Sequence, residues 1–180
     1  MANPYVTMPT GLEQVVALLE TGQQAPFGVK LGISLVEAAY GHAVFEATPD
    51  ATSYNPMGGV HGGYISAILD SACGIAAHTA LKPGYSYTTL ELKVSFLRSL
   101  SEHSGTVRAV GRLISIGGRA AFAEATLHDA AGGLYATATS TLLVFRTRSG
   151  WICRMTNLAP VEMGTYKSSG TGPRHSNPSA

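Results

Sequence analysis

The longest apolar segment of the chain, residues 64–80, predicts a buried helix. The segment is rich in Ala and too long for one strand, and both properties favour a helix. Apolar side chains occupy nearly its whole circumference, which is typical of a helix covered on most sides. At about 1.5 Å per residue it would extend roughly 25 Å, the width of a small domain.

Alternation of apolar and polar residues elsewhere predicts strands. Residues 31–39 and 42–47 are expected to form two strands joined by a tight turn at Tyr40-Gly41. Three or four further strands are expected after the long helix, over residues 87–97, 105–115, 120–128 and 134–145. In the first of these, Leu90, Leu92, Val94 and Phe96 alternate with polar residues and are expected to share one face.

Strands with one apolar and one polar face indicate an antiparallel sheet, which needs a helix to cover it. Thr10 and Glu13 match a capping box that begins a short amphipathic helix over residues 11–21. The expected fold class is therefore α+β, with a curved antiparallel sheet wrapped around one long central helix.

Composition limits the classes of function. The chain has 180 residues, 45% hydrophobic and 13% charged, so we expect apolar surface to be covered in an oligomer. A net charge of +1 gives no general attraction to nucleic acid or anionic membrane. No signal peptide or long apolar span is recognisable, so the cytoplasm is expected. Cys73 and Cys153 match no disulfide framework, and no metal-ligand spacing occurs, so no metal is expected.

Charge changes sign near the C-terminus. Residues 1–145 hold 7 Lys and Arg against 10 Asp and Glu, or −3, whereas residues 146–180 hold 5 against 1, or +4. The final segment also ends in Ser, Gly and Pro. We therefore expect a lead-in with one helix over residues 1–28, one domain over 29–146, and a basic tail over 147–180 that is mostly unstructured at its end.

Asp70 carries the only charge between His61 and Ala80. A carboxylate in an apolar helix costs several kcal/mol unless it is hydrogen bonded or paired. It is either anchored by Ser66, Ser71 or a backbone N–H, or it serves chemistry. Glycines at the start of the helix leave first-turn N–H groups uncovered, and these could hold a developing oxyanion. The alternative role for the glycines is close helix packing.

The motif N-x5-HGG-x6-D, formed by Asn55, His61-Gly62-Gly63 and Asp70, is followed by TTLELKVSFLRS. Residues 29–145 thereby resemble the hotdog-fold acyl-CoA thioesterases, and among them the phenylacetate-pathway (PaaI-like) type. The resemblance implies hydrolysis of acyl-CoA thioesters without metal or other cofactor, coenzyme A being part of the substrate. It also implies a homodimer or a homotetramer in which two sheets join edge to edge.

By the same resemblance, the Gly62 N–H polarises the thioester carbonyl, and Asn55 and His61 shape the site around it. Gly63 belongs to the substrate-binding turn. Asp70 is supplied by the opposite subunit and acts as general base or nucleophile. His61 could instead be a structural donor in the first helical turn.

A hydroxyl residue on the next strand is implied to hold the attacking water, which maps to Thr89 or, one residue earlier, to Thr88. Coenzyme A carries phosphates, so a basic rim is expected. Arg98, Arg112 and Arg119 near predicted strand ends are candidates for it, although each could be a solvated strand terminus.

Two other functions remain open. An acyl-CoA hydratase or dehydratase of the same fold needs a His working with the acid, and no His accompanies Asp70 at short spacing. A non-catalytic acyl-CoA sensor would keep the pocket without the chemistry. The basic tail leaves that possibility open, whereas the presence of both HGG and Asp70 counts against it.

Overall fold

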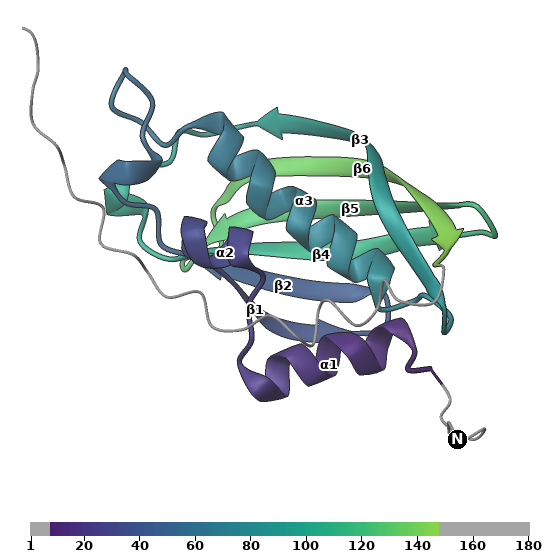
Figure 1. The fold of residues 1–180 in the computed structure, drawn as a ribbon. Coiled ribbons are helices and arrows are strands. Elements are labelled where there is room, and N and C mark those ends of the chain that lie inside the picture. Colours follow the sequence, from purple (N-terminus) through teal and green to yellow (C-terminus); the bar gives the residue numbers. More distant parts are fainter. Residues whose placement is uncertain (1–7, 148–180) are drawn as a thin grey trace, which may run out of the picture.

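The computed structural model describes residues 8–147, without the side chain of Glu102. A six-stranded sheet curves around one long helix, α3 (Figure 1). The strand order is β1-β2-β4-β5-β6-β3, and all neighbours are antiparallel. The strands are β1 (Ile33–Ala39), β2 (His42–Ala47), β3 (Tyr85–Phe96), β4 (Val107–Ile116), β5 (Ala120–Asp129) and β6 (Leu134–Arg146). The expected α+β fold is confirmed.

The first helix, α1 (Gly11–Thr21), begins with the predicted capping box. The Thr10 hydroxyl accepts from the Glu13 N–H at 3.2 Å, and the Glu13 carboxylate accepts from the Thr10 N–H at 2.7 Å. The helix packs against β1 and the C-terminal part of α3. Gly11 allows the close contact, because a Cβ there would lie 1.8 Å from the carbonyl oxygen of His78.

A second helix, α2 (Pro26–Leu31), is absent from the sequence prediction. The expected strand from residue 31 was therefore wrong at its start, since β1 begins at Ile33. Six residues are too few to show a helical period. The available signals were Pro26 in the first turn and Gly32, whose φ of 64° ends the helix.

The central helix α3 (Gly62–His78) begins two residues before the predicted start and ends two before the predicted end. The core-facing side of its middle is fully buried, with Ile68, Leu69 and Ala72 at 0% exposure. The sheet approaches it closely at Gly111 in β4, where a Cβ would lie 2.1 Å from the Ala72 carbonyl oxygen. Small side chains on the inner faces of β5 and β6 continue this close packing; they are Ala121, Ala123, Ala125, Ala136 and Ala138.

Strand β3 contains a bulge at Leu90. Thr89 pairs with Leu142 and Glu91 with Thr141 of β6, so Leu90 has no position in the register. A bulge shifts the alternation by one residue. Leu90 is accordingly 62% exposed, and the prediction that it shares a buried face with the apolar residues after it was wrong.

The sheet has two edges, β1 and β3. Strand β6 ends at Arg146, and Thr147 still donates its N–H to the Gly84 carbonyl at 2.9 Å. The predicted tail beyond Thr147 lies outside the described residues, as does Cys153. Among the helices of residues 8–147, none is long and apolar enough to span a membrane.

Candidate functional site

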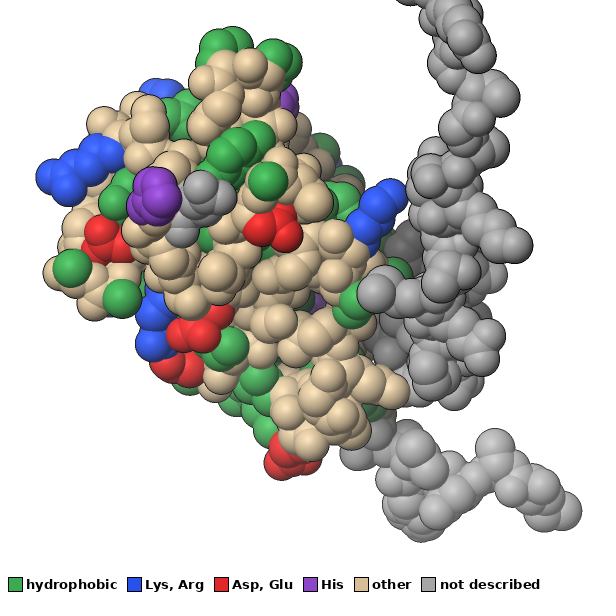
Figure 2. Space-filling view, turned by 90° about the vertical axis from the view of Figure 1, so that its left-hand side faces the viewer, with side chains coloured by type: hydrophobic (Ala, Val, Ile, Leu, Met, Phe, Trp, Pro, Cys, Tyr) green, Lys and Arg blue, Asp and Glu red, His purple; other side chains and the backbone are tan. Residues whose placement is uncertain are grey.

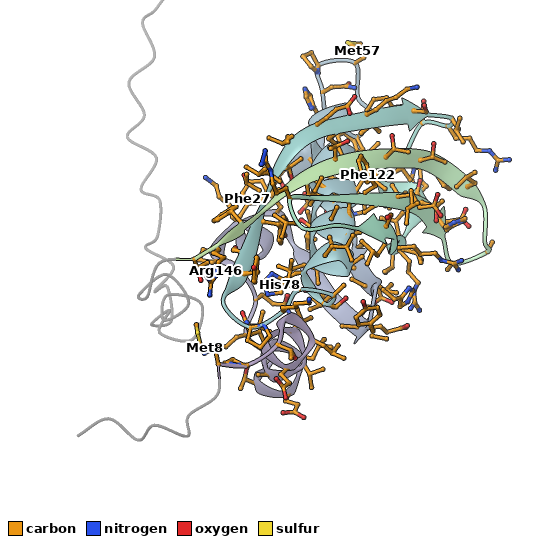
Figure 3. The ribbon with its side chains drawn as sticks, turned by 90° about the vertical axis from the view of Figure 1, so that its right-hand side faces the viewer. Met8, Phe27, Met57, His78, Phe122 and Arg146 are labelled. Atoms are coloured by element: carbon orange, nitrogen blue, oxygen red, sulfur yellow. The ribbon has the colours of Figure 1, made fainter. Side chains whose placement is uncertain are left out.

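The loop before α3 is held by Asn55. Its side-chain oxygen accepts hydrogen bonds from the N–H groups of Met57 at 2.9 Å and Gly59 at 3.2 Å. Its backbone N–H also donates to the Gly59 carbonyl at 2.8 Å. The loop extends from the body of the molecule with Met57 at its tip, 86% exposed (Figure 3). Asn55 therefore holds the conformation of the loop that leads to the helix start.

His61 is the N-cap of α3. Its Nδ1 atom accepts a hydrogen bond from the Gly63 N–H at 2.8 Å, and its own N–H donates to the Ser53 carbonyl at 2.8 Å. The structural role considered for His61 is therefore present, with the side chain as acceptor rather than donor. Nδ1 must be unprotonated to accept this bond.

Gly62 presents a free donor. Its N–H has no hydrogen-bond partner within residues 8–147, whereas the Gly63 N–H is taken by His61. The first turn of a helix carries about half a positive charge, which favours a developing negative charge there. A Cβ at residue 62 would lie 3.2 Å from the Phe96 ring, so this end of β3 packs against the helix start.

Asp70 is half-buried in the single chain, not fully buried as the apolar helix suggested. The Thr89 hydroxyl donates to its Oδ1 atom at 3.0 Å. The serines considered as anchors are engaged elsewhere: Ser66 donates to the Gly62 carbonyl and Ser71 to the Ala67 carbonyl, both at 2.8 Å. The strand hydroxyl is thus the partner of the carboxylate.

The two candidate threonines are separated by the pleat of β3. Thr89 faces α3, whereas Thr88 is exposed and pairs with Leu143 of β6 on the other face of the sheet. Thr89, and not Thr88, therefore contacts Asp70.

Two residues near Asp70 were not singled out as site residues by the sequence. Burial, together with the charges of Asp70 and Glu124, raises the pKa of the Cys73 thiol to about 12, so this thiol stays protonated. Tyr87 lies over Gly74, where a Cβ would be 2.4 Å from its hydroxyl oxygen. The glycine inside an otherwise Ala-rich helix was the signal available for this contact.

Gly62 and Asp70 are eight residues apart on one helix, which corresponds to about 12 Å along its axis. The oxygen and the carbon of one carbonyl group are directly bonded and only about 1.2 Å apart. A donor and a base separated by this distance cannot serve the same carbonyl from one chain.

The three candidate arginines do not come together. Arg119 lies in the β4–β5 turn and Arg98 follows β3, where its N–H donates to the Tyr135 carbonyl. These positions are at opposite ends of β5, roughly 30 Å apart at about 3.3 Å per residue. Arg112 pairs with Glu124 across β4 and β5. In Figure 2 the Lys and Arg side chains on the visible face are likewise dispersed.

Two further features bear on ligands. Among the described residues, no group of three His, Cys, Asp or Glu side chains could hold a metal ion. A cavity of about 360 Å³ lies at the C-terminal end of α3, lined in part by Leu81, Tyr85 and Val144. Along the inner face of β3 the order is Thr89, Tyr87 and Tyr85, so this cavity lies beyond Tyr87 from Asp70.

A family model and a curated relative match the chain. The family model of the thioesterase superfamily matches residues 57–136. A protein of Saccharolobus solfataricus, provisionally named an esterase, is 30% identical over 119 residues, which cover 66% of this chain and 82% of that protein.

Solved structures have the same fold. The PaaI protein from the phenylacetic acid degradation operon of E. coli has a TM-score of 0.65 at 19% identity, covering 77% of this chain and 94% of its own. A Streptococcus mutans protein bound to acetyl CoA has a TM-score of 0.58 at 26% identity, covering 64% and 90%. The six-stranded antiparallel sheet around one long helix is the hotdog fold, and the chain belongs to the thioesterase superfamily.

Proposed function

We propose that this protein hydrolyses acyl-CoA thioesters to a free acid and coenzyme A. The observation that carries the proposal is a free N–H at Gly62 and a Thr89-bound carboxylate at Asp70 on one helix. Membership of the thioesterase superfamily supports hydrolysis of a thioester. The Streptococcus mutans relative bound to acetyl CoA supports coenzyme A as the thiol part.

The chemistry needs only these groups. Asp70, as general base, takes a proton from a water molecule while the water oxygen attacks the thioester carbonyl carbon. The carbonyl oxygen gains negative charge, which the Gly62 N–H stabilises. The C–S bond then breaks, and the CoA thiolate takes the proton held by Asp70, so the free acid and the CoA thiol leave and the Asp70 carboxylate is restored. Direct attack by Asp70 would form an anhydride that water then opens, giving the same products.

The site is proposed to lie between two copies of the chain. Along α3, Gly62 contacts Phe96, Asp70 contacts Thr89 and Gly74 contacts Tyr87, so α3 runs antiparallel to β3. If β3 pairs with its own copy in antiparallel fashion across a two-fold axis, the two α3 helices also run in opposite directions. The Gly62 end of one helix then approaches the Asp70 region of the other.

The free edge of β3 supports this arrangement. Leu90 is 62% exposed, Phe96 53% and Leu97, which follows β3, 54%, and β3 is an edge strand of the sheet within residues 8–147. An exposed apolar edge strand is a template for pairing with another chain. We therefore propose a homodimer through β3, with pairs of dimers forming a tetramer.

The acyl group is proposed to be a small aromatic or a short to medium chain, as the likeness to the phenylacetate-pathway type suggests. Release of the CoA thiol, followed with a thiol reagent over aryl, short-chain and long-chain thioesters, tests both the activity and its range. The same assay separates hydrolysis from the two alternatives, because neither a hydratase nor a sensor releases a thiol.

Two variants test the machinery. Asp70→Asn keeps the volume and removes the base, so kcat is expected to fall by ~10²–10⁴. Gly62→Pro removes the free N–H at the first helical position, where proline is tolerated, and is expected to lower kcat as well. Asp70 is not the base if Asp70→Asn keeps more than about a tenth of the wild-type kcat.

A mixture of the two variants tests the shared site. In a heterodimer of Asp70→Asn with Gly62→Pro, one of the two sites combines an intact Gly62 from one chain with an intact Asp70 from the other. The purified heterodimer is therefore expected to have up to about half of the wild-type activity, and a random mixture of the co-expressed chains up to about a quarter. Two inactive variants that stay inactive in a purified heterodimer would show that the site is not shared.

A further inference from the structure

Tyr87 brings a hydroxyl group to the face of α3 that carries Asp70. Its Oη atom lies 2.4 Å from the position that a Cβ on Gly74 would occupy, so the phenol fills the space of the missing side chain. Residue 74 follows Asp70 by four positions, and residues at this spacing are neighbours on the helix surface. The ring also makes an edge contact with His78, at 5.8 Å between centroids.

The Tyr87 hydroxyl is a hydrogen-bond donor that has no acceptor among residues 8–147. It makes no hydrogen bond with any residue of the described chain 8–147. Burial and the charge of Asp70 raise the pKa of Tyr87, so the phenol keeps its proton. The Tyr87 side chain is half-buried, and its hydroxyl is not among the fully buried polar groups without a partner in residues 8–147, so a water molecule can reach it.

The spacing defines that acceptor. Side chains at i and i+4 on a helix have Cβ atoms roughly 5–6 Å apart, and Oη is close to the Cβ position of residue 74. Within residues 8–147 no direct hydrogen bond joins the Tyr87 hydroxyl to Asp70, and this spacing suits two groups that are bridged by one water molecule. Thr89 already occupies Oδ1 of the carboxylate, which leaves the second oxygen for the bridge.

We propose that the Tyr87 hydroxyl positions the attacking water against Asp70, with Gly74 providing the space for it. The water donates one proton to Asp70 and accepts a hydrogen bond from Tyr87, and its second lone pair remains free to attack the carbonyl carbon. Asp70 takes the proton as the new C–O bond forms. Tyr87 keeps its own proton throughout, and the products are those of the proposed hydrolysis, on which this inference rests.

Tyr87→Phe tests the hydroxyl alone, because the ring and its contact with His78 are retained. Loss of one hydrogen bond to the attacking water is expected to lower kcat about tenfold, with KM and melting temperature unchanged. Tyr85→Phe is the matched control, since Tyr85 lies two residues away on the same face of β3 and is expected to keep the wild-type kcat. The inference is overturned if Tyr87→Phe has a normal melting temperature and a kcat within twofold of the wild type.

A transfer of the hydroxyl from strand to helix gives a second readout. Tyr87→Leu opens the space over Gly74, and Gly74→Ser in that background returns a hydroxyl to the same place from α3. The control is the double variant Tyr87→Leu with Gly74→Ala, which also replaces the glycine but adds no hydroxyl. The serine variant is expected to exceed the alanine variant severalfold in kcat, and equal kcat values would overturn the positioning role.

The failure of the inference is distinguishable from that of the proposed function. Wild-type protein that releases no thiol from any acyl-CoA of the panel overturns the proposed function and the inference with it. Active wild-type protein with an unaffected Tyr87→Phe variant overturns only the role of Tyr87.

Discussion

The Thr89 hydroxyl donates a hydrogen bond to Oδ1 of Asp70 at 3.0 Å and so connects the edge strand β3 to the middle of α3. The bond leaves the second carboxylate oxygen available and fixes the direction in which it points. It also couples the proposed base to the strand that we propose as the dimer interface. The geometry of Asp70 therefore depends on the register of β3.

Thr89→Val is expected to lower kcat about tenfold, because the valine keeps the shape of threonine but cannot donate to Asp70. Thr88→Val is the matched control, since Thr88 is exposed on the opposite face of the same strand. Steady-state hydrolysis of an acyl-CoA by both variants is the measurement. Equal loss of activity in the two variants would contradict the assignment.

His61→Ala is expected to lower the free energy of unfolding by about 1 kcal/mol, because the Gly63 N–H loses its capping acceptor. His61→Asn restores a side chain that caps helices well and is expected to recover most of that loss. Urea denaturation of the two variants and the wild type gives the comparison. If asparagine is as damaging as alanine, the cap is not the main contribution of His61.

Gly111→Ala is expected to destabilise the protein by about 1–3 kcal/mol or more, because the new Cβ would lie 2.1 Å from the Ala72 carbonyl oxygen. Gly118→Ala introduces the same methyl group where no atom lies within 4 Å of it. Melting temperatures are expected to fall for the first variant and to stay close to wild type for the second. A normal melting temperature for Gly111→Ala would mean that sheet and helix are less closely packed than described.

Burial lowers the pKa of His78 below its ordinary value of 6.5. As the pH falls through about 6.5, the unfolded chain gains a proton at His78 while the folded chain remains neutral there. The unfolded state then binds more protons, so the free energy of unfolding decreases as the pH falls, until the lowered pKa is reached. The free energy of unfolding of His78→Gln is expected to depend less on pH.

The measurement is urea denaturation of wild type and His78→Gln between pH 7.5 and pH 5, a range set around the ordinary histidine pKa. Asp129, whose pKa is lowered by the Gly133 N–H, contributes below this range, so it does not obscure the effect. Parallel curves for the two proteins would exclude His78 as the source of the pH dependence.

A chain ending after Thr147 is expected to keep its turnover. Thr147 makes two contacts with the Gly84 carbonyl, through its N–H at 2.9 Å and its hydroxyl at 3.1 Å, so this end point preserves the last contacts of the sheet. Turnover and melting temperature are measured for the full and the shortened chain. A shortened protein that folds and remains oligomeric but loses activity would place part of the site in residues 148–180.

The sequence by itself determined the features that depend on neighbouring residues. The Ala-rich run predicted α3, and alternation predicted the strands with ends displaced by a few residues. Thr10 and Glu13 predicted the cap of α1. The spacing from His61 to Asp70 predicted that a helix start and a carboxylate lie on one element. These signals are local because capping, helical propensity and pleating act within a few residues.

Only the tertiary structure decided what β3 presents to α3. The bulge at Leu90 arises from pairing with β6, about fifty residues later in the chain. The alternation of apolar and polar residues in β3 alone does not show which residue is left unpaired. Beside this bulge, Tyr87 and Thr89 lie on the inner face of β3, whereas Thr88 lies on its outer face. The contact of Tyr87 with Gly74 likewise joins residues from different elements. Such contacts depend on how strands and helix pack together, and that packing is decided by the whole chain.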